Sequence, residues 1–142
     1  MFQTIILAGN LGRDPEMRYA PNGNPVTTFS VATNRQYTNN NGENIKETIW
    51  FRVSVWGKMA ETCNQYLKKG SKVLVEGRLT ADPVSGGPRI WQSKDGQSRA
   101  SFEVTAQTVR FLTSRSESEA GAGGAATSEE APSTPSDEDI PF

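Results

Sequence analysis

Apolar and polar side chains alternate along most of residues 1–111, with the period of two that half-buried strands produce. Clusters of Asn, Gly and Pro interrupt the alternation and indicate turns between the strands. The pattern predicts five strands, over residues 4–11, 26–34, 45–56, 72–79 and 101–111. Between the last two strands it predicts a loop over residues 82–88 and a short extended arm over residues 90–94, which turns at Asp95-Gly96.

One segment has a helical period instead. Its apolar residues fall on one helix face, and they are Met59, Ala60, Cys63, Tyr66 and Leu67. Gly70 is placed to end this helix just beyond Lys68 and Lys69. Three strands, one helix and two further strands predict an all-β fold with one helix, a five-stranded Greek-key barrel of the OB-fold type. An RRM would need two helices, and a cold-shock barrel would lack this one.

The alternation stops after residue 112. From residue 113 to residue 136, 19 of 24 residues are Gly, Ala, Ser, Thr or Pro. Such a segment buries too little apolar surface to offset the entropy lost on ordering, so we expect a disordered linker. The chain therefore divides into one domain over residues 1–112, a linker over residues 113–136 and an acidic tip over residues 137–142.

The charge is distributed unevenly between these parts. Residues 1–112 carry 14 Lys and Arg against 9 Asp and Glu, a balance of +5, whereas residues 113–142 carry one Arg against 7 acids, a balance of −6. The net charge of −1 therefore hides a basic domain on an acidic tail. A basic domain favours a polyanion partner, with nucleic acid as the first candidate. A mildly basic surface without such a partner is the alternative.

The acidic tip combines three carboxylates with an apolar end. Arg or Lys clusters of another protein can bind the carboxylates, and a pocket can take the terminal side chain and its free carboxylate. The alternative is a solubilising tail, but such a tail gains nothing from ending on large apolar residues. We interpret the tip as a partner-docking peptide made of Asp137, Glu138, Asp139, Ile140, Pro141 and Phe142.

The third predicted strand divides its side chains between two faces. One face is apolar and is predicted to join the core through Ile49, Phe51, Val53 and Val55. The other face carries Trp50, Arg52, Ser54 and Trp56. Indoles on the open side of a sheet suit base stacking, and a guanidinium between them suits phosphate or cation–π contact. This face predicts a nucleic-acid platform, and burial of both indoles under a loop or in a subunit interface is the alternative.

Two more aromatic residues stand beside cations. Tyr37 follows Arg35 at the edge of an Asn-rich loop, and Trp91 lies between Arg89 and Lys94. The repeated pairing of an aromatic ring with a cation strengthens the nucleic-acid interpretation. The predicted DNA-binding residues are Arg35, Tyr37, Trp50, Arg52, Trp56, Arg89 and Trp91.

Catalysis is disfavoured by the residue types that the chain contains. It has no His and one Cys, so Cys63 has no imidazole partner and no multi-cysteine metal site can form. Asp14 and Glu16 offer only a weak Mg²⁺ alternative. We predict a protein that is not an enzyme and uses no cofactor or metal. Because no run of 18 apolar residues and no secretory signal occur, we expect a cytoplasmic protein without a membrane partner.

Six motifs occur in an order that resembles the bacterial single-stranded DNA-binding protein family. They are Gly9-Asn10-Leu11-Gly12-Arg13-Asp14-Pro15, Arg18-Tyr19-Ala20-Pro21-Asn22-Gly23, Trp50-Phe51-Arg52-Val53, Gly57-Lys58, Tyr66-Leu67-Lys68-Lys69-Gly70-Ser71 and Val75-Glu76-Gly77. The resemblance spans residues 2–111 and returns at residues 137–142. It places the stacking aromatics of the family on Tyr37, Trp50, Trp56 and Trp91.

The resemblance implies an OB fold, usually a homotetramer, that coats single-stranded DNA without sequence preference. It also implies recruitment of replication, recombination and repair proteins through the tip, and a nucleoid-associated location. Residues 80–88 form a longer segment than in many relatives, acidic at Asp82, and Phe51 stands where many relatives have His. The alternative function is a non-catalytic OB module for RNA or for protein assembly.

Overall fold

The computed structural model describes residues 1–113, and the predicted docking tip and all but the first residue of the predicted linker lie outside this range. No helix within the described residues is long and apolar enough to cross a membrane. The elements in chain order are β1 (Ile5–Leu11), β2 (Glu16–Tyr19), β3 (Pro25–Thr38), β4 (Asn44–Trp56), α1 (Lys58–Tyr66), β5 (Lys72–Leu79), β6 (Ile90–Gln92), β7 (Ser98–Ala100) and β8 (Phe102–Phe111).

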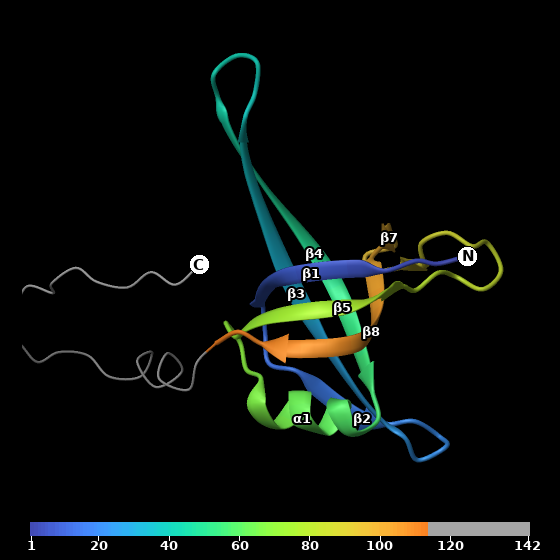
Figure 1. Ribbon diagram of the computed structural model, residues 1–142. Helices are drawn as coiled ribbons and strands as arrows, with labels where there is room; N and C mark the ends of the chain where they lie inside the picture. The colour runs from blue at the N-terminus through green and yellow to red at the C-terminus, as the bar shows by residue number, and fades with distance from the viewer. Residues whose placement is uncertain (114–142) are drawn as a thin grey trace, which may run out of the picture.

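Five strands close into a barrel in the order β1-β5-β8-β4-β3. Closure comes from β1, which also pairs with β3 at Asn10↔Ala32 and Leu11↔Val31. The pairing of β4 with β8 is parallel, and the other pairings in the barrel are antiparallel. Helix α1 lies against one end of the barrel beside β2 (Figure 1). The predicted fold class, an all-β barrel of the OB type with one helix, is confirmed.

The core is built from the inward side of each barrel strand. Its largest fully buried side chains include Phe29, Val53 and Val75, and Cys63 and Leu67 join them from the helical segment. The buried Thr27 hydroxyl donates a 2.6 Å hydrogen bond to the Ala60 carbonyl, which ties α1 to β3. The period of two therefore corresponds to burial, whereas the helical period does so only in part, because Met59 and Tyr66 of the predicted apolar face are exposed.

The apolar face of β4 is buried only in part, which corrects the prediction of a complete core face. Val53 and Val55 are buried, but Phe51 is only partly buried and stacks at a tilt on Phe102, with the ring centroids 5.7 Å apart. Ile49 is 42% exposed. The reason is length, because β3 and β4 continue past the barrel as a long ribbon (Figure 1).

The helix ends earlier than predicted. Helix α1 stops at Tyr66, and Leu67 is extended, with φ −89° and ψ 146°, so that its side chain enters the core. Lys68 then belongs to a turn, in which the Ser71 amide donates to the Lys68 carbonyl. Gly70 has a φ of +88° and serves this turn, not the helix end itself.

Candidate nucleic-acid interface

The outward side of β4 carries Trp50, Arg52 and Trp56, which we call the β4 platform. Their cross-strand partners on β3 are Ala32, Ser30 and Val26 in that order. Because these partners are small, no large side chain of β3 rises beside the rings. Trp50 is 52% exposed and Trp56 is 49% exposed. The structure therefore brings these three predicted residues together on one accessible face.

The platform continues across β3 onto β2. Register pairs Glu16 with Thr28 and Arg18 with Val26, so their side chains share the outward side with the platform. A hollow of about 130 Å³ opens there, lined by Glu16, Met17, Arg18, Thr28 and Arg52. Within residues 1–113, neither Arg18 nor Arg52 has a carboxylate in ion-pair distance. Two arginines against one carboxylate, Glu16, leave the hollow with an excess of positive charge that is suited to an anion such as phosphate.

Arg35 and Tyr37 are not brought together with the platform. Register pairs Tyr37 with Ile45 and Arg35 with Glu47, which places both residues on the opposite side of the β3–β4 ribbon. There the Arg35 guanidinium lies 4.9 Å from the centroid of the Tyr37 ring. The Tyr37 hydroxyl donates a 3.3 Å hydrogen bond to Glu47, whose carboxylate is 4.0 Å from Arg35. This cluster is a second, separate aromatic site.

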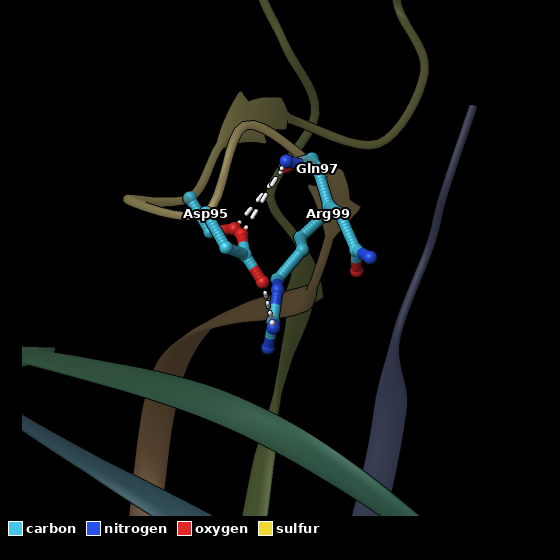
Figure 2. Close-up of polar contacts among 4 residues, drawn as sticks. Asp95, Gln97 and Arg99 are labelled. Carbon is cyan, nitrogen blue, oxygen red and sulfur yellow. Dashed lines mark hydrogen bonds and ion pairs between the residues drawn. The ribbon is translucent and has the colours of Figure 1, made fainter.

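The predicted arm is a small hairpin of β6 and β7. Trp91 pairs with Arg99, so the indole and this guanidinium share one side of the hairpin, and Arg89 immediately precedes β6. The Asp95 carboxylate accepts 3.3 Å hydrogen bonds from the Gln97 amide and from Arg99, which closes the turn (Figure 2). The arm therefore presents an aromatic ring with a cation held beside it.

The loop before the arm is organised by Asp82. Its carboxylate accepts hydrogen bonds from the Ser85 amide at 2.9 Å, the Val84 amide at 3.0 Å and the Ser85 hydroxyl at 3.1 Å. These donors, the Ser85 amide first, hold the pKa of Asp82 below its ordinary value, and Arg89 adds a smaller effect. The loop thus keeps a negative charge near Arg89, which weakens the positive field at the base of the arm.

Residues 2–112 match the model of the single-strand binding protein family. The chain belongs to this family. The match confirms the resemblance that the sequence motifs indicated, and it covers every strand of the barrel.

Two curated relatives illustrate the similarity. A single-stranded DNA-binding protein of Neisseria meningitidis is 42% identical over 118 residues, which are 83% of this chain and 64% of that protein. One of Wolinella succinogenes is 40% identical over 124 residues, 87% of this chain and 72% of that protein. The chain thus spans about two thirds of the length of these relatives.

Solved structures agree with the fold. A Plasmodium falciparum single-stranded DNA-binding protein in complex with single-stranded DNA has a TM-score of 0.66 at 28% identity, covering 80% of this chain and 97% of that one. The small single-stranded DNA-binding protein of Streptomyces coelicolor has a TM-score of 0.62 at 26% identity, and the match covers 77% of this chain and 93% of that chain.

Two cations of this family member were not predicted from its sequence. Arg18 enters the site through the pairing of β2 with β3, and β2 has only four residues, too few to show a period. Arg99 enters through the pairing of β7 with β6, and β7 has three residues. The motif containing Arg18 was visible in the sequence, whereas its position beside Arg52 depends on strand register.

Proposed function

We propose that this protein binds single-stranded DNA without sequence preference, by stacking bases on the β4 platform. The observation that carries the proposal is a pair of half-exposed indoles on one strand face with a guanidinium between them. Every base has a π-face, so stacking is tolerant of sequence. Membership of the family and the DNA complex of the Plasmodium relative support the same function. The protein acts by binding and performs no catalysis.

The spacing of the platform suits a short stretch of DNA. Trp50 and Trp56 are six residues apart on one strand, which is about 20 Å at roughly 3.3 Å per residue. About six stacked nucleotides cover that distance at the 3.4 Å rise of a nucleic-acid strand. The hollow beside Arg18 and Arg52 lies along this path and accepts the phosphates. Tyr37 with Arg35, and Trp91 with Arg89, provide further contacts for a longer strand.

The test compares ligands and variants. Unlabelled single-stranded DNA should compete with a labelled thymidine oligonucleotide far better than duplex DNA or RNA of the same length. Trp50→Ala and Trp56→Ala should each cost about 1–3 kcal/mol of binding free energy, the scale of one base stack. Phe2→Ala, which also removes an exposed ring, is the matched control. Unchanged affinity in both folded tryptophan variants, or stronger competition by RNA, would refute the proposal.

The proposal extends to replication, recombination and repair, with partner proteins recruited by residues 137–142. The composition of residues 113–136 supports a flexible tether, whose root-mean-square reach is about 27 Å for 24 residues. Deleting the tip should leave DNA binding intact and abolish capture of repair and replication proteins by DNA-saturated protein. Phe142→Ala should do most of the same damage. Equal recovery of partners by intact and deleted protein would favour a solubilising tail.

We also propose a homotetramer in the cytoplasm, associated with the nucleoid. Strand β1 pairs with β5 along most of its length, but only Asn10 and Leu11 pair with β3. Along residues 5–8 its other edge therefore has no paired strand within the described residues, and Ile6 is 63% exposed there. A second copy can pair with such an edge in a two-fold dimer, and two such dimers would complete the tetramer through a second interface. Light scattering that gives a monomer at micromolar concentration would contradict this assembly.

A further inference from the structure

The Trp50 indole lies directly against the backbone of Gly12. A β-carbon added to Gly12 would lie 2.5 Å from Cζ3 and 2.7 Å from Cη2 of Trp50, and the next nearest atom is Cε3 of the same ring at 3.7 Å. Carbon atoms in good contact are about 3.5–4.0 Å apart. The six-membered ring of the indole therefore occupies the space that any side chain at residue 12 would need.

Backbone conformation does not explain the glycine at this position. The described glycines with positive φ are Gly23, Gly42, Gly57, Gly70, Gly86 and Gly96. Gly12 is outside that group, so a left-handed backbone conformation is not the reason for glycine here. The steric requirement for glycine comes from Trp50, whose ring supplies the three nearest atoms that the added β-carbon meets.

The backbone segment that meets the edge of the indole is fixed at several points. The Gly12 amide donates to the Ser30 carbonyl at 3.1 Å. Leu11 is buried, and its amide and carbonyl are hydrogen-bonded to Ser71 at 2.9 Å and to the Gly70 amide at 2.8 Å. The Asp14 carboxylate accepts a 2.8 Å bond from the Lys69 amide. Because these bonds join residues 11–14 to β3 and to the turn after α1, an added methyl group cannot be absorbed by movement of this segment.

We propose that Gly12 is a positioning residue for base stacking, because its missing side chain lets the Cζ3–Cη2 edge of the Trp50 indole pack against the backbone and so fixes the orientation of a ring that remains 52% exposed. The inference rests on the proposed function of the β4 platform. A ring held in one orientation loses less conformational freedom when a base stacks on it, and this preorganisation favours binding. Gly12 itself need not touch DNA, since its effect acts through Trp50.

The first experiment needs no DNA. Trp56→Phe and Trp91→Phe leave Trp50 as the only tryptophan of the three. In this background Gly12→Ala should shift the emission of Trp50 to longer wavelength and increase its quenching by acrylamide, because the displaced indole enters water. Gly87→Ala is the matched control, since its β-carbon meets only the Ser85 hydroxyl oxygen at 3.7 Å. The proposal would be overturned if the Gly12→Ala variant had the same emission wavelength and the same acrylamide quenching as its parent in this background.

The second experiment measures affinity for a thymidine oligonucleotide of about 16 nucleotides, the upper site size of one OB domain. Gly12→Ala should weaken binding about 5- to 150-fold, as one lost base stack does, without changing the salt dependence. Added to Trp50→Ala, it should cause no further loss. Losses that multiply in the double variant would show that Gly12 acts independently of Trp50 and would overturn the proposal.

Thermal melting separates positioning from a general effect on folding. Gly12→Ala should lower the melting temperature when residue 50 is Trp, and much less when Trp50→Ala has removed the ring. An equal loss in both backgrounds would refute the contact, and this comparison remains decisive if Gly12→Ala alone folds poorly. If the parent protein fails to bind DNA, the proposed function is refuted. The emission and melting experiments still show whether Gly12 fixes the orientation of the indole.

Discussion

Replacing Arg52 and Arg18 by alanine, singly and together, should lower the affinity for single-stranded DNA and flatten its dependence on salt. Both guanidiniums line one hollow beside the β4 platform, and neither has an ion-pair partner within residues 1–113. Their charge is therefore available to a phosphate, which must release a condensed cation when it binds. The loss of affinity should be larger in dilute salt than in concentrated salt.

The magnitude follows from counterion release. Each phosphate contact on single-stranded DNA contributes about −0.7 to the slope of log K against log salt. Between about 50 mM and 200 mM salt, one contact therefore changes the affinity about 2.6-fold and two contacts about 7-fold. Arg52→Ala should flatten the slope by about 0.7 and the double variant by about 1.4. Glu16 lines the same hollow, so Glu16→Gln should strengthen binding at low salt.

The assay is a tryptophan-quenching titration with one oligonucleotide at four or more salt concentrations. Arg52→Lys is the matched control, because it keeps the charge and should keep the slope while losing bidentate contact. An unchanged slope in the folded double variant would show that the hollow holds no phosphate. A slope that changes equally in Arg52→Lys would show that geometry, and not charge, sets the salt dependence.

Two further predictions concern the folded domain. Burial raises the pKa of Cys63 to about 11 from an ordinary value of 9.0, so the unfolded chain loses this proton first and stability should fall as the pH rises from 9 to 11. Cys63→Ala should remove that part of the pH dependence in urea unfolding, and an identical pH profile would refute it. Thr27→Val should cost about 1 kcal/mol, because the hydrogen bond to Ala60 is lost. Thr27→Ser keeps the hydroxyl, so a melting temperature no higher than that of Thr27→Val would contradict the role of this bond.

The barrel was predictable from the sequence because burial follows the period of two along its strands. The fourth predicted strand, residues 72–79, has the observed bounds of β5, with Val73 and Val75 buried and Lys72 and Glu76 exposed. The helix was placed correctly by its apolar face, but its end was not. Leu67 continues the helical period, yet it reaches the core from an extended conformation that the period cannot distinguish from helix.

The sequence predicted burial on the apolar face of β4 correctly only in the part of the strand that belongs to the barrel. Ile49 and Val53 have the same parity, and nothing local distinguishes them. Their burial differs because β4 begins outside the barrel, at the hairpin turn, and enters the barrel only after Ile49. The residue at which it enters is set by the lengths of the neighbouring strands. The exposure of Trp50 and Trp56 on the open face of β4 was predicted correctly, because an exposed face needs no covering element whereas a core face does.

The separation of Tyr37 from Trp50 depends on the register of the β3–β4 hairpin. Residues 39–43 connect the strands, and the Asn39 side chain accepts hydrogen bonds from the Asn41 and Glu43 amides, which fixes the turn and places Thr38 opposite Asn44. A shift of one residue would move Tyr37 to the side of Trp50, because side chains alternate with a period of two. The turn therefore decides that a DNA strand stacking on both rings must pass around the edge of the ribbon, and an aromatic count along the sequence does not contain that information.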